Sequence, residues 1–562
     1  MPPIEHSVDI CSEIRRLAAE KPERVFCHVV GKSDTQVMTY ARLFAAAHRY
    51  AAVYSERGVR SGDVIFIILR HCSDLFSSFL GAMLVGALPS FLPFLTSKQQ
   101  PELYWAAHRA LFSRTRARLL VTWPGNLAAM REAIPDFSMD VHLAEETPRK
   151  QQPATPIPER AASGPAFLQH SSGTTGLKKG VVITHEALAT QIRTYSNALQ
   201  LDQNDVIASW LPLYHDMGLI ACFLMPAMLG VPVVTMDQFD WVLRPSLLLD
   251  VIEQYRATLT WLPNFAFHHL ATCVPEGKRW DLRSVRAFIS CSEPCKPETF
   301  RRFRERFEPM GVGPNQLLTC YALAENVFCA TQSRPGATVR VLRADRAEFL
   351  SCGEPIEGVQ ARIIDSDGRV LPDRTVGEVA LSGGSLFDGY YLNPEETSAR
   401  LRDGWYWTGD LGFVHNNELF VTGRKDDLLI VHGINYYAHD VEYAANQVAG
   451  VAPGRCVAIG DSHPESGSTE VILLAEALEP DCVNAPELKR AIKERILSET
   501  GLLVQQVGIV PRGWLIKTTS GKISRIENLR RFRQSKQSHH DSQHTCRIAF
   551  EPSPGCHPAH IS

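Results

Sequence analysis

Residues 170–180, HSSGTTGLKKG, decide the fold, and they lie between two apolar runs that we predict to be strands. Two serines, two threonines, three glycines and two lysines stand among these eleven residues. Glycines let backbone N–H groups turn toward an anion at close range, hydroxyls add donors, and a lysine adds positive charge. The stretch therefore predicts a loop that binds a triphosphate.

This loop differs from the phosphate loop of P-loop NTPases, G-x-x-x-x-G-K-[ST]. Gly173 and Gly176 are only three positions apart, and Lys179-Gly180 is followed by two valines rather than by a hydroxyl residue. A flexible surface loop would explain a Ser/Thr/Gly run by itself. The flanking strands and the lysine favour phosphate binding.

Length and composition indicate a soluble globular protein of two to four domains. A chain of 562 residues is too long for one core, and 45% hydrophobic and 21% charged residues are ordinary for a globular protein. The net charge of -3 gives no reason to expect nucleic acid or an anionic membrane as partner. We expect no signal peptide, no membrane span and a cytoplasmic location, because the chain lacks the required apolar runs.

The 14 cysteines form no C-x-x-C pair and are interpreted as scattered thiols. Zinc ligands or disulfides are alternatives that no spacing supports.

Strands and helices alternate from residue 63 onward and again over 205–345, which predicts an α/β layer fold. Short alternating strands follow over 359–422 and predict a β-barrel part within about 352–422. The composition then shifts, so we place a first domain at 1–425 and a smaller α+β domain at 426–533. The polar, His-rich tail 534–562 is predicted to be disordered; a metal-binding tail is the alternative, although no regular ligand spacing supports it.

The phosphate loop resembles the signature loop of the adenylate-forming (ANL) superfamily, which includes acyl-CoA synthetases, luciferases, peptide-synthetase adenylation domains and fatty acyl-AMP ligases. The usual loop ends in Pro-Lys-Gly; here Lys178 stands in place of the proline, and Lys179 matches the family lysine. The resemblance implies the fold described above, with a C-terminal domain that is mobile relative to the first, and with ATP and Mg²⁺ as cofactors. It implies that the ATP phosphates are bound by Ser171, Ser172, Gly173, Thr174, Thr175, Gly176 and Lys179.

Other motifs follow in the family's order. Tyr321-Ala-Leu-Ala-Glu325 resembles Tyr-Gly-x-x-Glu, which implies that Tyr321 and Ala322 contact adenine and that Glu325 holds Mg²⁺. Ser290-Cys-Ser-Glu-Pro294 resembles a neighbouring element, so Ser292, Glu293 and Pro294 are assigned to nucleotide binding. As isolated patterns these would more often be an ordinary helix start or strand end.

The last motifs complete the nucleotide site. Trp407-Thr-Gly-Asp410 resembles the ribose-binding element, with Asp410 as the carboxylate. Gly423-Arg424 resembles the hinge segment, in which Arg424 reaches ribose or phosphate and Asp426 is the pivot. Thr518-Thr-Ser-Gly-Lys522 resembles the element that carries the adenylation lysine. A surface turn or a surface lysine explains each motif by itself, but five motifs in this order are improbable by chance.

The segment Leu211-Pro-Leu-Tyr-His215-Asp-Met-Gly-Leu is most like the fatty acyl-AMP ligases and adds His215 to the catalytic residues Lys522 and Glu325. Peptide-synthetase domains place an aspartate for the substrate α-amine where this chain has Trp210-Leu-Pro-Leu-Tyr-His; no such carboxylate is evident in that stretch, so an amino acid substrate is not favoured. Fatty acyl-AMP ligases carry an inserted segment that hinders the use of CoA. In this chain residues 330–350 occupy that region as a short counterpart, so the sequence does not decide whether CoA is accepted.

These resemblances imply ATP-dependent activation of a fatty or other carboxylic acid to acyl-AMP, with pyrophosphate released. Transfer to an acyl carrier protein or to a polyketide or peptide synthase would follow, as part of lipid metabolism. Two alternatives remain at this point: an acyl-CoA synthetase, with CoA as acceptor, and a nucleotide-binding protein without catalysis.

Overall fold

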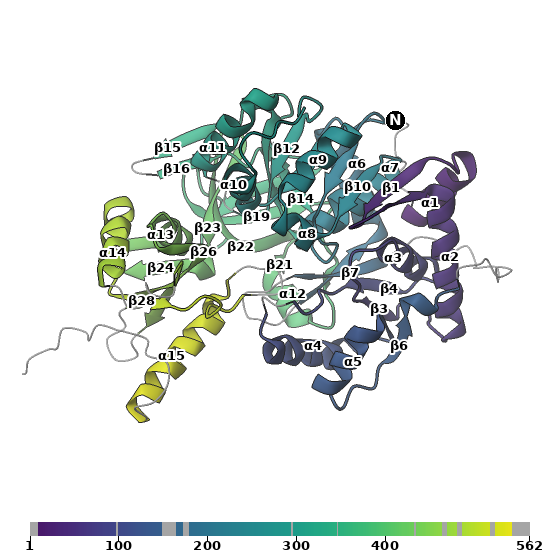
Figure 1. Ribbon diagram of the computed structural model, residues 1–562, viewed down its shortest axis with the longest axis horizontal. Coiled ribbons are helices and arrows are strands. Elements are labelled where there is room, and N and C mark those ends of the chain that lie inside the picture. The colour runs from purple at the N-terminus through teal and green to yellow at the C-terminus, as the bar shows by residue number, and fades with distance from the viewer. Residues whose placement is uncertain are drawn as a thin grey trace, which may run out of the picture. The chain divides into compact units, whose positions relative to one another are not determined.

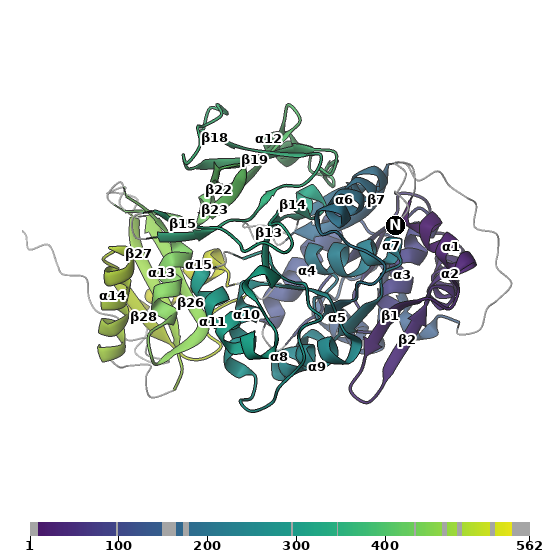
Figure 2. The ribbon, with the colours of Figure 1, turned by 90° about the horizontal axis from the view of Figure 1, so that it is seen from above.

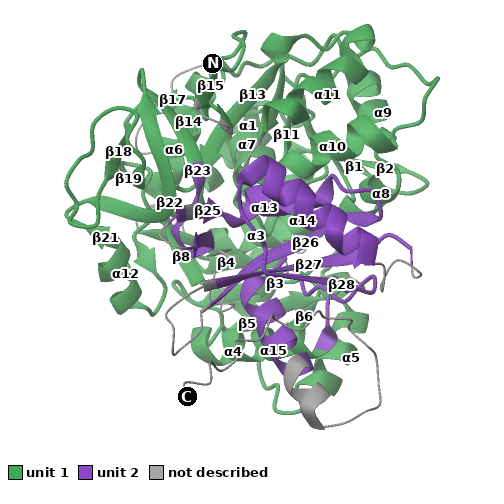
Figure 3. Cartoon of the chain, turned by 90° about the vertical axis from the view of Figure 1, so that its left-hand side faces the viewer, with its two compact units in different colours: residues 1–95, 102–173, 177–421 green, residues 96–101, 174–176, 422–562 purple. Residues whose placement is uncertain are grey.

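The computed structural model describes residues 9–96, 99–148, 164–171, 179–293, 296–344, 347–431, 434–462, 469–479, 486–517 and 523–541. Contacts divide the chain into two compact units, a large one within residues 1–421 and a small one that consists of residues 422–562 together with the short stretches 96–101 and 174–176 (Figure 3). The predicted domain boundary at 425/426 stays a prediction.

The large unit is built on a nine-stranded sheet in the order β17-β14-β13-β12-β11-β9-β10-β1-β2 (Figure 1). Its strands are β1 (Val25–Val30), β2 (Thr35–Thr39), β9 (Ile207–Ser209), β10 (Val233–Met236), β11 (Leu259–Leu262), β12 (Ala287–Ser290), β13 (Leu317–Ala322), β14 (Cys329–Gln332) and β17 (Glu354–Pro355). The inner strands pair in parallel, and β2, β14 and β17 are antiparallel additions at the edges. Strands β10 and β11 are buried along their whole length, as expected for a parallel sheet that is covered on both faces.

Helices cover both faces of this sheet. The buried residues of the central strands β9 to β12 are divided between two apolar cores, with Leu259 in one core and Leu262 in the other. The first core contains α1 (Ile10–Glu20), α2 (Tyr40–Glu56), α3 (Asp74–Leu84), α6 (His185–Ala198), the π-helix η2 (Met217–Leu224) and α7 (Met225–Leu229). The second contains α8 (Gln238–Leu243), α9 (Ser246–Tyr255), α10 (Asn264–Cys273) and α11 (Pro297–Phe307).

A second sheet, in the order β4-β3-β5-β6, is parallel throughout. Its strands are β3 (Val64–Ile67), β4 (Leu88–Phe91), β5 (Leu119–Thr122) and β6 (Asp140–Leu143), and they alternate with α3, α4 (Pro101–Thr115) and α5 (Pro124–Ala133). The strand–helix alternation predicted from residue 63 is therefore confirmed.

Strands β7 (Pro165–Ser171) and β8 (Lys179–Thr184) form an antiparallel hairpin, with β20 (Gly389–Tyr390) added to β8. The pair Ser171 and Lys179 closes the described part of the hairpin. The predicted phosphate loop thus joins two strands, whereas the loop of P-loop NTPases leads from a strand into a helix.

The strands predicted for 359–422 are present as an open antiparallel sheet (Figure 2). Its members are β18 (Val359–Ile364), β19 (Gly377–Gly383), β21 (Leu401–Arg402), β22 (Trp405–His415) and β23 (Glu418–Arg424). The short helix α12 (Pro394–Arg400) lies between β20 and β21 in the sequence. Within the predicted counterpart of the CoA-hindering segment, β15 (Val341–Ala344) and β16 (Ala347–Leu350) pair as a separate hairpin.

The small unit combines sheets and helices, as its sequence predicts. Its elements are β24 (Leu428–Val431), β25 (Ile434–Tyr437), α13 (Ala438–Asn446), β26 (Val451–Ser462), β27 (Thr469–Ala477), α14 (Pro486–Thr500), β28 (Gln506–Val510) and α15 (Arg525–Asp541). Helix α15 runs past residue 534, so the disorder predicted from that position is wrong for its first eight residues. The remainder of the tail lies outside the described residues. Throughout the described ranges, no helix has both the length and the apolar composition needed to cross a membrane.

Candidate nucleotide site

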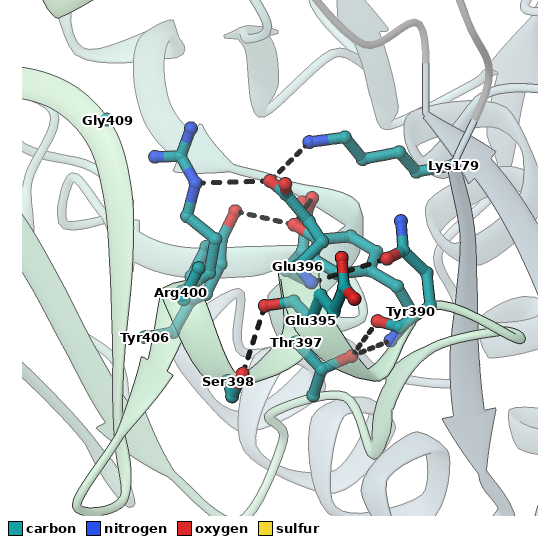
Figure 4. Close-up of polar contacts among 12 residues, drawn as sticks. Lys179, Tyr390, Glu395, Glu396, Thr397, Ser398, Arg400, Tyr406 and Gly409 are labelled. Atoms are coloured by element: carbon teal, nitrogen blue, oxygen red, sulfur yellow. Dashed lines mark hydrogen bonds and ion pairs between the residues drawn. The ribbon is translucent and has the colours of Figure 1, made fainter.

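Lys179 is the first residue of β8, and its side chain is 19% exposed. Its Nζ lies 2.5 Å from Oε1 of Glu396 and 5.3 Å from the centre of the Tyr390 ring (Figure 4). Glu396 lies in the first turn of α12, where the Asn393 side chain caps the helix by accepting the Glu396 N–H. Arg400, one turn further along, donates from Nε to the same Oε1 at 3.4 Å. The hydrogen bond from Lys179 lowers the pKa of Glu396, so this carboxylate is charged at neutral pH.

Glu325 lies in the turn after β13 and is 9% exposed. Its Oε1 accepts a hydrogen bond of 2.8 Å from the Tyr390 hydroxyl, which lies 3.3 Å from the Tyr406 hydroxyl. Burial raises the pKa of Tyr390, which keeps this hydroxyl protonated as a donor. The turn is strained, because the buried, β-branched Val327 has a φ of 60°. Strain of this kind persists only where the surrounding contacts enforce it, so the position of Glu325 is tightly specified.

Tyr321 and Asp410 are joined directly. The Tyr321 hydroxyl donates to Asp410 Oδ2 at 2.5 Å, and both residues are buried. The turn that presents Asp410 needs a glycine, since Gly409 has a φ of 76° and its N–H donates to Glu378 at 3.0 Å. The predicted adenine-stacking residue therefore also orients the predicted ribose carboxylate, a contact that the motifs did not reveal.

Three predicted residues follow parallel strands of the nine-stranded sheet, at the edge where the carboxyl ends of the strands meet. His215 follows β9, Ser292 follows β12 and Glu325 follows β13. His215 precedes η2, and its carbonyl accepts the Leu219 N–H at 2.8 Å. A Cβ on Gly218 would lie 2.3 Å from the carbonyl oxygen of Pro212, so only glycine fits this close turn.

Glu293 is positioned by a neighbouring helix. Its Oε2 accepts the Phe265 N–H at 3.1 Å, in the first turn of α10. Ser292 has a φ of 69°, which is uncommon for a serine and marks a sharp turn after β12. Ala322 ends β13, opposite Cys329 of β14.

The residues that connect these positions belong to none of the sequence motifs. Lys179 pairs with Glu396, which also accepts from Arg400, although Lys179 and Glu396 are 217 positions apart. Lys179 also lies near the ring of Tyr390, whose hydroxyl contacts Glu325 and Tyr406. No local pattern around Glu396 indicated this pairing. Asp216, which follows His215 in the motif quoted above, accepts the Met217 N–H through its side chain at the start of η2.

The other predicted residues belong to the small unit or lie outside the described ranges. Arg424 ends β23, and Asp426 lies in the 3-10 turn Lys425–Asp427. The side chain of Ser171 lies outside the described part of the chain. So do Ser172, Gly173, Thr174, Thr175, Gly176, Pro294 and Lys522.

Within the small unit, three charged residues connect the hinge turn to α15. Arg525 Nη2 donates to both carboxylate oxygens of Glu442 at 2.9 Å, and Arg525 Nη1 lies 2.8 Å from Asp427. The N–H of Ala458 donates to Glu442 as well. Residues Lys517 and Ile523 form a β-bridge on either side of the segment that contains Lys522.

The model of the AMP-binding enzymes matches residues 14–391, so the chain belongs to this family. The predicted family, fold and enzyme class, a ligase, are confirmed. The long-chain-fatty-acid–AMP ligase FadD26 of Mycobacterium marinum is 29% identical, over 89% of this chain and 92% of that protein. The medium-chain-fatty-acid–[acyl-carrier-protein] ligase JamA of Moorena producens is 26% identical, over 88% and 90%.

Solved structures agree on the fold. A structure from a study of fatty acyl-adenylate ligases of E. coli and L. pneumophila matches 96% of this chain and 100% of that one, with a TM-score of 0.86 and 24% identity. The L. pneumophila fatty acyl-adenylate ligase in complex with acyl adenylate and pyrophosphate is 25% identical, with a TM-score of 0.73, over 94% and 96%.

Proposed function

We propose that this protein activates a fatty acid or a related carboxylic acid as its acyl-AMP and passes the acyl group to the phosphopantetheine thiol of an acyl carrier protein. The observation that carries the proposal is the connected set of nucleotide-site residues in the large unit. Lys179, Glu325 and Tyr390 lie in one network, and the Tyr321–Asp410 hydrogen bond joins β13 of the nine-stranded sheet to β22 of the antiparallel sheet. The similarity to acyl-AMP and acyl-carrier-protein ligases supports the same chemistry.

Adenylation would proceed by attack of a substrate carboxylate oxygen on the α-phosphorus of ATP. A carboxylate O–P bond forms, the bond from the α-phosphorus to the bridging oxygen breaks, and pyrophosphate leaves. Asp410, held by Tyr321, would accept hydrogen bonds from the ribose hydroxyls. Lys179, and Lys522 from the small unit, would bind phosphate oxygens and oppose the growing negative charge.

Glu325 fits the role of a magnesium ligand. It is a hard oxygen donor, and the hydrogen bond that it accepts from Tyr390 leaves its carboxylate further lone pairs for a cation. When bound, Mg²⁺ would neutralise charge on the ATP phosphates. One carboxylate suffices, because magnesium usually keeps several waters and takes further ligands from phosphates.

The acid is proposed to lack an α-amine. Asp216, the carboxylate next to His215, accepts the first N–H of η2, and the surrounding segment is apolar and largely buried. Such a surface favours an alkyl or aryl acid, whose burial contributes about 0.8 kcal/mol for each CH₂ group. CoA is the alternative acceptor, and whether the β15–β16 hairpin disfavours it is part of the test.

Replacement of the adenylation lysine tests the mechanism. We expect Lys522→Ala to abolish acyl-AMP formation while ATP still binds, because the lysine acts on charge that develops during the reaction. Arg512→Ala, at an exposed position of the same unit, is the control and should leave the rate unchanged. Near-normal turnover by Lys522→Ala would overturn the assignment.

A further inference from the structure

We propose that the Glu396 carboxylate is a placeholder, a group that occupies the position taken by a phosphate group of ATP when ATP binds. Arg400 and Lys179 together bind this phosphate. The inference rests on the proposed function only in that the site accepts ATP. It adds two residues of α12 to the nucleotide site, neither of which belongs to a motif identified above.

The geometry around Glu396 is that of a bound anion. One carboxylate oxygen accepts from two cations, Lys179 Nζ at 2.5 Å and Arg400 Nε at 3.4 Å. Figure 4 shows the two cations reaching this carboxylate from different sides. A single phosphate oxygen has the same charge and the same ability to accept from both donors, and arginine and lysine are the usual side chains for phosphate.

Arg400 also lies beside the ribose-binding turn. A Cβ added to Gly409, the residue before Asp410, would lie 3.0 Å from Arg400 Nη1. On the other side of the cluster, the Tyr390 ring lies near Lys179, and its hydroxyl donates to Glu325. Arg400 and Glu396 therefore stand between the residues proposed to bind ribose, magnesium and phosphate.

A ligand can displace this pair without breaking the fold. The side chains of Lys179, Glu396 and Arg400 are 19%, 28% and 33% exposed, so a solvent-borne anion can reach them. A partly exposed ion pair contributes about 0.2–1 kcal/mol. ATP carries several negative charges and would compete effectively with one carboxylate for the two cations.

The test is equilibrium binding of an ATP analogue with a methylene group between the α- and β-phosphorus, measured by calorimetry with Mg²⁺. This analogue cannot be cleaved at that bond, so the result does not depend on catalysis. We expect Glu396→Gln to bind it about two- to fivefold more tightly, since the competing charge is gone. Arg400→Gln should bind it about tenfold more weakly, and Arg400→Lys should recover part of the loss.

Two matched controls stand on the same segment. Glu395→Gln changes the preceding, exposed acid of α12, and Arg402→Gln removes an exposed arginine whose guanidinium lies on the Trp407 ring. Both should bind the analogue within twofold of the wild-type affinity. Thermal unfolding of each variant confirms that the fold is retained.

Weaker or unchanged binding by Glu396→Gln would overturn the placeholder role, and weaker binding would instead indicate a magnesium ligand. Unchanged binding by Arg400→Gln would overturn the role of Arg400. These outcomes are separate from the proposed function. If the variants shift the affinity as expected but no acid is adenylated, the inference stands and the proposed function fails.

Discussion

Two clusters of charged side chains, one in each unit, are similar in exposure but differ in how fully their hydrogen bonds are made. In the large unit, Lys179 and Arg400 share one oxygen of Glu396. In the small unit, Arg525 donates to both oxygens of Glu442 and pairs with Asp427.

The exposures are close: 25% for the Arg525 side chain and 18% for Glu442, against 19% and 28% for Lys179 and Glu396. The number of partners, rather than exposure, separates the clusters. A carboxylate held by two arginine bonds and a backbone N–H is part of the fold, whereas one that accepts through a single shared oxygen can be exchanged for a ligand. Four predictions test this difference, from the largest expected effect to the smallest.

The largest effect is expected at Glu325, which belongs to the network of the large unit. Glu325→Gln should lower the rate of acyl-AMP formation about a hundredfold, because the amide is a poor magnesium ligand. The melting temperature should change little, since the amide still accepts a hydrogen bond from Tyr390. Pyrophosphate release and thermal unfolding measure the two quantities. A large fall in melting temperature with little loss of rate would mean that this network stabilises the fold and does not take part in the reaction.

The next effect is on stability in the small unit. Arg525→Met should lower the free energy of unfolding by about 2 kcal/mol, because Glu442 would lose both its arginine bonds. Chemical denaturation measures the change, and hydrogen exchange followed by mass spectrometry should show faster exchange in peptides of α13 and the hinge turn. Arg533→Met is the control, because Arg533 belongs to the same helix as Arg525 and forms a surface ion pair with Asp461. Equal losses in the two variants would contradict the contrast between the clusters.

The pH dependence of stability should report Glu442. Burial raises the pKa of this carboxyl from its ordinary value of 4.5 to about 7, an effect larger than the lowering by Arg525. Because the folded state holds the proton more tightly, the stabilising contribution is complete below pH 4.5 and is lost as the pH rises through 7. The slope is up to about 1.4 kcal/mol per pH unit. Glu442→Gln should remove this slope, and an unchanged slope in the variant would assign it to another group.

The smallest effect is expected from the exchangeable pair. Glu396→Gln should change the free energy of unfolding by less than about 0.5 kcal/mol, as is usual for partly exposed ion pairs. Chemical denaturation next to Arg525→Met gives the comparison directly. A loss as large as that of Arg525→Met would mean that Glu396 holds the fold and is no placeholder.

The sequence was sufficient for the order of the motifs and for their local structures. The apolar runs on either side of the glycine, hydroxyl and lysine residues predicted two strands, and these are β7 and β8 of the hairpin. Such features depend on neighbours within a few positions.

The pairings between distant residues could not be predicted. Tyr321 meets Asp410 across 89 positions, Lys179 meets Glu396 across 217, and Arg525 meets Glu442 across 83. These contacts arise when packed strands and helices bring side chains together, and no periodicity in one sequence records which partner a charge will find. The fold was therefore predictable, whereas the connections within the site were not.

The most direct test of the central claim is to incubate the protein with ATP, Mg²⁺ and a panel of medium-chain, long-chain and aryl acids, and to identify products by mass. Parallel samples contain CoA or a carrier protein with its phosphopantetheine arm. We predict acyl-AMP and pyrophosphate, with acyl-AMP that persists when CoA is present and is consumed when the carrier protein is present. Acyl-CoA as the product would contradict the proposed acceptor. The absence of an adenylate from every acid, although the ATP analogue binds, would contradict the proposed activation step.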